Sequence, residues 1–120
     1  MIYYSARLHV VSVLESKAAT ADSKYICDYP FVVFRAADDE AAYERALALG
    51  MDQEHEYENG DGELVRWRLR AVEQIWRLGN DVDGKEVGSI LDVYEPDGPL
   101  DIRRPFSPET VKPTISDWDC

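Results

Sequence analysis

The segment DQEHEYENGDGELVRWRLRA, residues 52–71, has an acid at every second position before a glycine-rich turn and an arginine at every second position after it. Side chains that alternate with a period of two lie on one face of a β-strand. Residues 60–62 fit a three-residue hairpin loop whose last glycine is left-handed, and such a loop fixes the register of the two strands. The predicted pairs are Glu54 with Arg68, His55 with Trp67, Glu56 with Arg66, and Tyr57 with Val65. One face of the hairpin is then charged and paired, and the other is apolar.

A helix is predicted immediately before this hairpin. Asp38 can accept the first free amide protons of a helix, and Ala42, Ala46 and Leu49 recur at helical spacing. The small alanines permit a close approach to a sheet. Gly50 either ends the helix in a left-handed cap or lies inside a helix that continues past it. In the second case Asp52 leaves the hairpin, and only the pairs from Glu54 or Glu56 onward remain.

Segments with a period of two predict the remaining strands. Residues 2–15 and 25–36 precede the helix, and residues 86–94 return from a two-residue turn at Asp83-Gly84. The fold class is therefore predicted to be α+β, with one antiparallel sheet of about five strands and one helix packed on one face. The predicted order along the chain is ββαβββ.

The strand predicted over residues 63–78 changes phase. Its apolar side chains occupy odd positions up to Ala71 and even positions from Val72 onward, the latter including Trp76. A strand keeps both sets on one face only if a β-bulge lies near the change of phase. We expect a bulge there, because a sheet that curls around a helix needs one.

Residues 1–94 are predicted to form a single α+β domain, because the 120-residue chain is long enough for one core. Residues 95–120 contain every proline except Pro30, which argues against regular secondary structure through most of this tail. Apolar residues within the tail predict that it packs in part on the domain. Cys27 and Cys120 show neither metal-ligand nor disulfide spacing and are expected to be free thiols.

The charge distribution is strongly acidic, with a formal net charge of -11. Pairing across the hairpin leaves an acidic surplus, which repels nucleic acid and anionic membranes and favours encounters with basic proteins. Acidic surfaces also serve solubility alone. The sequence has no apolar run long enough to span a membrane, and its first residues do not resemble a signal peptide, so a cytoplasmic protein is expected.

Four spaced stretches of the sequence carry a family resemblance: YYSARL, VVFRAADDEAAYERALALG, EYENGDGELVRWRL and VDGKEVGSILDVY. Together they resemble a small bacterial family known as domain of unknown function 4288, over residues 2 to about 94. The resemblance rests on residues that build the fold and implies no activity and no catalytic residues. Small acidic members of this kind are also similar in size and charge to immunity proteins of bacterial toxin systems.

The sequence contains few residues in the arrangements that catalysis requires. The histidines are His9 and His55, and the predicted register packs His55 against Trp67, as expected of a structural strand residue. The turn ENGDGE lacks the ligand spacing of a calcium loop, and no nucleotide-binding or zinc-protease motif occurs. The sequence therefore predicts no catalytic residues, no metal site and no cofactor.

Two functional hypotheses remain. The first is a non-enzymatic, immunity-type inhibitor whose acidic surface covers the basic active site of a toxin, and the second is a structural or oligomeric module, such as a homodimer. For the first, the candidate partner-binding residues are acids that the hairpin leaves unpaired and that lie on the solvent side of the helix or beside the turn. They are Asp39, Glu40, Glu44 and Glu58.

Overall fold

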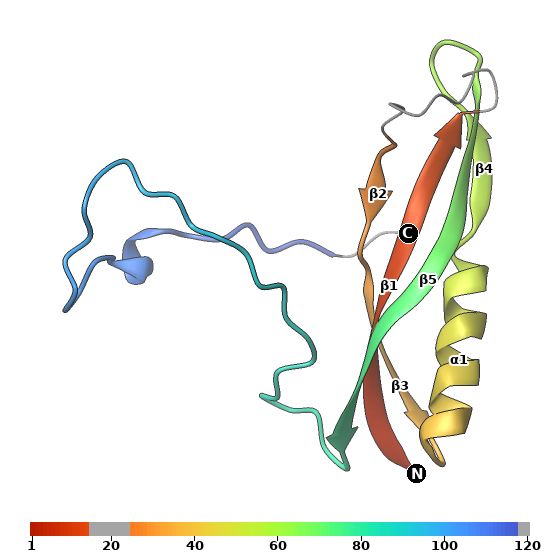
Figure 1. Ribbon diagram of the computed structural model, residues 1–120, viewed down its shortest axis with the longest axis horizontal. Helices are drawn as coiled ribbons and strands as arrows, with labels where there is room; N and C mark the ends of the chain where they lie inside the picture. The colour runs from red at the N-terminus through yellow and green to blue at the C-terminus, as the bar shows by residue number, and fades with distance from the viewer. Residues whose placement is uncertain (15–24, 118–120) are drawn as a thin grey trace. The chain divides into compact units, whose positions relative to one another are not determined.

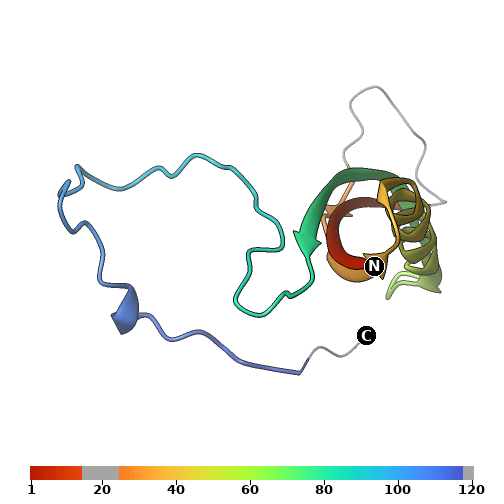
Figure 2. The same ribbon diagram turned by 90° about the horizontal axis from the view of Figure 1, so that it is seen from below.

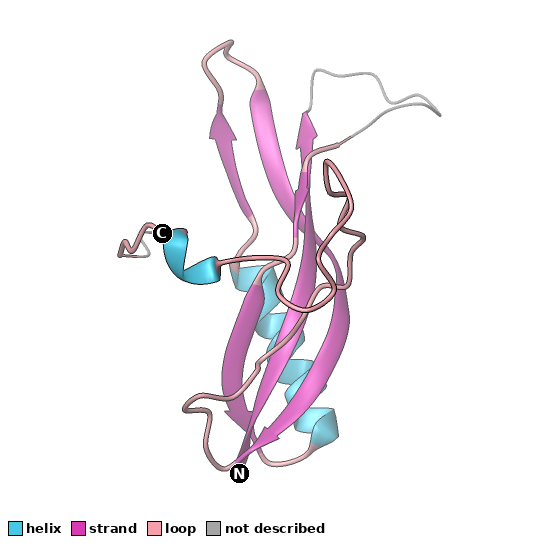
Figure 3. Ribbon diagram, turned by 90° about the vertical axis from the view of Figure 1, so that its left-hand side faces the viewer, coloured by secondary structure: helices cyan, strands magenta, loops and turns pink. Residues whose placement is uncertain are grey.

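The computed structural model describes residues 1–14 and 25–117, and its contacts divide the chain into two units, Met1–Ile90 and Leu91–Cys120. The first unit holds one antiparallel sheet of five strands and one α-helix (Figures 1 and 3). The predicted α+β class is therefore confirmed. The elements are β1 (Ile2–Leu14), β2 (Cys27–Asp28), β3 (Phe31–Ala36), α1 (Asp39–Asp52), β4 (His55–Glu58) and β5 (Leu64–Gly79).

β1 is the central strand of the sheet. It pairs along one edge with β5, which in turn pairs with β4, and along its other edge with β2 and β3. The strand predicted over residues 25–36 is divided at Tyr29-Pro30, because a proline has no N–H to donate to the ladder. The chain still lies beside β1 at this point, since the Leu8 amide donates to the Pro30 carbonyl at 2.9 Å.

The element order is βββαββ, so the predicted order ββαβββ is wrong. The turn at Asp83-Gly84 is present, with the Lys85 amide donating to the Val82 carbonyl, but residues 86–94 form no strand. Side chains of β1 hold this segment instead: the Ser5 hydroxyl donates to the Val87 carbonyl. Residues 86–89 therefore contact the sheet through Ser5, on the face opposite α1, and not through its edge.

The core lies between α1 and the sheet. Asp38 caps the helix as predicted, its carboxylate accepting the Ala41 amide at 2.8 Å. Ala42 and Ala46 are fully buried and pack in one cluster with side chains from β1 and β3. The sheet side of this cluster consists of Tyr4, Ala6, Leu8, Phe34 and Ala36.

The helix continues through Gly50, so the alternative in which this glycine caps it is wrong. Gly50 is buried against β5, where an added Cβ would lie 2.8 Å from both methyl groups of Leu69. Glycine is thus required for close contact between helix and sheet and not for a left-handed turn.

Bulges on β5 allow the sheet to curl, as the change of phase predicted. The register with β1 shifts on either side of Ala71 and Val72, which leaves Arg70 and Glu73 without partners in the ladder. A second shift, which the change of phase did not predict, reverses the alternation again and places Trp76 opposite Ser5, on the face away from the helix. The expectation that a bulge brings Trp76 to the same face as Trp67 is therefore wrong. The curl is visible end-on in Figure 2, where α1 lies against the inner side of the curved sheet.

The helix covers only part of this inner face. A 14-residue helix is about 21 Å long, whereas a 16-residue strand extends for about 50 Å. α1 begins at the end of the sheet where β1 begins, and it ends near the middle, where β4 continues in its direction (Figure 1). The inner face beside β4 is therefore left without a helix over it.

The second unit, described from Leu91 to residue 117, contains one short 3₁₀ helix, Pro108–Thr110. The rings of Tyr94 and Phe106 are in contact, with their centroids 5.5 Å apart. Cys27 is an exposed free thiol, whereas the predictions for Cys120 and for the last residue of the first strand, Glu15, lie outside the described residues.

Candidate functional site

The predicted acids of the helix divide into two groups. Glu40 and Glu44 are exposed, one turn apart, and make no ion pair with any residue that the structure describes. Asp39 is different, because its Oδ1 accepts the Tyr4 hydroxyl at 3.0 Å and Nε of Arg77 at 2.8 Å. Asp39 is exposed, as its predicted place on the solvent side of the helix implies, but its carboxylate is already paired within the fold.

Asp39 connects the start of the helix to the sheet. A second contact, between Asp39 Oδ2 and Arg77 Nη2, makes the pairing with the guanidinium bidentate. The hydrogen bonds from Arg77 first, and from Tyr4 second, lower the pKa of the Asp39 carboxyl. Burial and the neighbouring carboxylate raise the pKa of the Tyr4 hydroxyl, which stays protonated and donates. This trio lines a hollow of about 460 Å³.

Glu58 lies far from the helix acids. It is exposed at the end of β4 and faces Leu64 across the hairpin. β4 extends toward the turn, away from the first residues of α1 (Figure 1). Glu58 lies beside the turn as predicted, but the expectation that this position adjoins the acidic face of the helix is wrong, because β4 runs away from Glu40 and Glu44.

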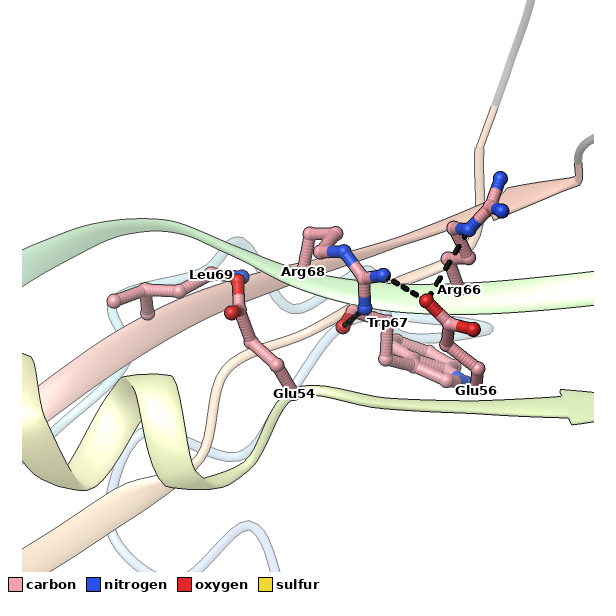
Figure 4. A network of polar contacts seen from close by, with 6 residues as sticks. All are labelled: Glu54, Glu56, Arg66, Trp67, Arg68 and Leu69. Atoms are coloured by element: carbon pink, nitrogen blue, oxygen red, sulfur yellow. Dashed lines mark hydrogen bonds and ion pairs between the residues drawn. The ribbon is translucent and has the colours of Figure 1, made fainter.

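Most charged side chains of the hairpin make ion pairs or hydrogen bonds within the protein (Figure 4). The predicted register is confirmed, with Glu56 opposite Arg66, His55 opposite Trp67 and Tyr57 opposite Val65, and Gly62 has a positive φ of 76°. Glu56 Oε1 accepts from Arg66 Nε at 3.3 Å and from Arg68 Nη2. These bonds, with that from Arg68 the larger cause, lower the pKa of Glu56.

The pair of Glu54 with Arg68 does not form, because the helix continues through Gly50 and the ladder begins at His55. Glu54 Oε2 instead accepts the backbone amide of Leu69 at 2.9 Å (Figure 4). Leu69 lies just beyond the last residue of β5 that β4 reaches, so its amide would otherwise project from an unpaired strand edge. The carboxylate satisfies this edge donor where the ladder ends.

An aromatic groove lies on the opposite face of the hairpin, on the part of the inner sheet face that α1 does not cover. The rings of Tyr57 and His55 have centroids 5.8 Å apart, and those of His55 and Trp67 are 6.3 Å apart, with interplanar angles below 20°. The groove has a volume of about 310 Å³. Its lining residues are Val10, Asp28, Gln53, His55, Tyr57 and Trp67.

The period-two pattern predicted that these rings lie on one face, but it did not predict a groove. His55 Nδ1 donates to the Gln53 carbonyl at 2.9 Å, which fixes the ring at the junction between α1 and β4. Asp28 enters from β2, which pairs with β1 at Val10. The sequence does contain a signal for the groove. A helix the length of the predicted one is much shorter than the strand predicted over residues 63–78, so it cannot cover the whole strand.

Metal-binding clusters are not found among the described residues, in which no three His, Cys, Asp or Glu side chains are grouped to hold an ion. No helix in the described part of the chain is long and apolar enough to cross a membrane.

Comparison with known families identifies a match that includes the helix and the hairpin. The model of the family described as Domain of unknown function (DUF4288) matches residues 3–89. The chain belongs to the DUF4288 family. The match begins in β1, includes the helix and both strands of the hairpin, and ends in the segment that contacts Ser5. No curated protein and no solved structure matches the chain.

Proposed function

We propose that this DUF4288 member acts by binding another protein, as an acidic immunity-type inhibitor that covers the basic active site of a toxin. The outer face of α1 carries the proposal. Glu40 and Glu44 are exposed there, while Ala42 and Ala46 hold the inner face of the helix against the sheet. A nuclease toxin is basic where it binds phosphate, so an acidic surface complements it.

Charge at this face acts mainly on the rate of association. The formal net charge of -11 attracts a basic partner from beyond contact distance, and the exposed helix acids orient the encounter. Salt screens such attraction over about 10 Å at 0.1 M, so binding weakens as the salt concentration rises.

The test reverses two helix charges, Glu40→Lys with Glu44→Lys, and measures association kinetics with the partner recovered from the native cell by pull-down. A matched control reverses Glu58 and Asp61 to Lys, which changes the net charge by the same amount at the end of the sheet far from the start of α1. The helix variant is expected to associate about tenfold more slowly at low salt, and the control much less so. Circular dichroism checks folding, since surface helix charges contribute only about 0.3–1 kcal/mol each.

Equal slowing in both variants would assign the effect to net charge and remove the helix face from the proposal. Parental association rates and salt dependence in the helix variant would make its acids a solubility feature. The second candidate, a homo-oligomeric module, is favoured by the exposed aromatic side chain of Tyr57 on the uncovered sheet face. Sedimentation of the purified chain as a dimer, with no partner recovered, would support that function.

A further inference from the structure

Aromatic side chains on this sheet are covered by the chain's own arginines in two places. The Arg7 guanidinium lies 5.8 Å from the centroid of the Trp76 ring, and that of Arg35 lies 5.5 Å from the Tyr3 ring. Both distances fall within the range of about 6 Å in which a cation is attracted to an aromatic face. The fold thus uses guanidinium groups to cover partly exposed rings.

The aromatic groove beside β4 has no such cover from the described residues. Arg66 and Arg68 flank Trp67 in sequence, but they lie on the opposite face of the strand, where both contact Glu56. The alternation of the strand makes this unavoidable, because neighbours in a strand point to opposite faces. No arginine of the described residues lies over these three near-parallel rings.

A carboxylate contributes to the same groove. Asp28 of β2 lines it, and Asp28 Oδ1 accepts the Tyr29 amide at 2.8 Å, which orients the side chain. Rings and one carboxylate are the groups that bind a guanidinium, which stacks on aromatic faces and donates to carboxylate oxygens. A volume of about 310 Å³ is at the small end of ligand pockets, as suits one side chain.

We infer that the groove formed by Asp28, His55, Tyr57 and Trp67 takes an arginine side chain of a basic protein partner. The inference rests on the proposed function, because the basic partner supplies the arginine. It places a specific contact on the sheet, in addition to the long-range attraction exerted by the helix acids.

A second copy of this chain is a poorer occupant than a basic partner. Two copies that each carry a net charge of -11 repel one another, and Asp28 would add local repulsion at this face. The same charges attract a basic segment. Charge complementarity therefore favours an arginine of a different protein.

The test uses the capped tripeptide acetyl-Gly-Arg-Gly-amide, with the citrulline tripeptide as a neutral control of nearly the same shape. The indole N–H signal of Trp67 is assigned with a Trp67→Phe variant and followed by NMR, with Trp76, which Arg7 covers, as the internal reference. The arginine peptide is expected to shift the Trp67 signal saturably, and the citrulline peptide to bind at least tenfold more weakly. Asp28→Asn, which keeps the acceptor for the Tyr29 amide, is expected to weaken arginine binding about threefold to tenfold.

Equal shifts from the two peptides would overturn the inference, because the groove would then bind without regard to charge. The absence of a Trp67 shift would overturn it as well. A Trp67 shift that depends on protein concentration and not on peptide would overturn it in favour of self-association. The proposed function is tested separately by the helix charges. If the Glu40 and Glu44 variant associates more slowly but the peptide does not bind, the role of the groove is rejected and that of the helix face stands. If the peptide binds but the variant associates at the parental rate, the role of the helix face is rejected and that of the groove stands.

Discussion

Replacing one buried alanine of α1 by leucine tests how closely the helix packs on the sheet. Ala46 has no exposed surface and lies in the core cluster, whereas Ala48, two residues along the same helix, is exposed. Ala46→Leu adds three carbon atoms to a filled site, and such overpacking costs about 1–3 kcal/mol. Ala48→Leu makes the same chemical change in solvent, where the lower helix propensity of leucine costs only about 0.2 kcal/mol.

The assay is urea unfolding followed by circular dichroism. With a slope of about 1–3 kcal/mol per molar urea, a loss of about 2 kcal/mol lowers the midpoint by roughly 1 M. The Ala46 variant should show this decrease and the Ala48 variant should remain near the parent. Equal midpoints for the two variants would refute the close packing of α1, and with it the assignment of Glu40 and Glu44 to an outer face.

Two further predictions concern other parts of the first unit. Because the pKa of Asp39 is lowered in the folded state, its charge stabilises the protein above the unfolded-state pKa, and this contribution is lost as the pH falls below about 4. Urea midpoints measured from pH 7 to pH 3 should therefore fall less steeply in an Asp39→Asn variant than in the parent, and parallel profiles would contradict the role of this pair. A Cβ at Gly88 would overlap the Phe31 ring, so Gly88→Val should lift residues 86–89 from the sheet and speed tryptic cleavage after Lys85, which an unchanged rate would contradict. Gly98→Val is the control, because no atom lies within 4 Å of a Cβ added there.

The candidate acids predicted from the sequence differ in whether the fold pairs them, and the difference has a physical reason. The exposure of Glu40 and Glu44 followed from helical periodicity, which the side chains of α1 obey. Asp39 looked equally free in the sequence, yet its partner Arg77 is 38 residues away. That pairing depends on how β5 curls past the start of the helix, which no local pattern records.

The sequence alone determined the features that depend on neighbouring residues. The period-two charges and the left-handed Gly62 set the register of the β4–β5 hairpin, and Asp38 set the first turn of the helix. The change of phase near Ala71 predicted one bulge there, because side chains a fixed number of residues apart keep a fixed relation along a strand, but it did not predict the second shift at Glu73.

Only the tertiary structure decided the path of residues 86–89 and the aromatic groove. A strand that pairs at a sheet edge and a segment held over a sheet face can have the same alternating pattern. The hydrogen bond from the Ser5 hydroxyl to the Val87 carbonyl holds this segment over the face. The groove beside Trp67 exists because a helix rises about 1.5 Å per residue and a strand about 3.3 Å, so α1 covers less than half the length of β5. Which half it covers depends on packing between distant residues, and this determines which aromatic side chains of the sheet α1 leaves uncovered.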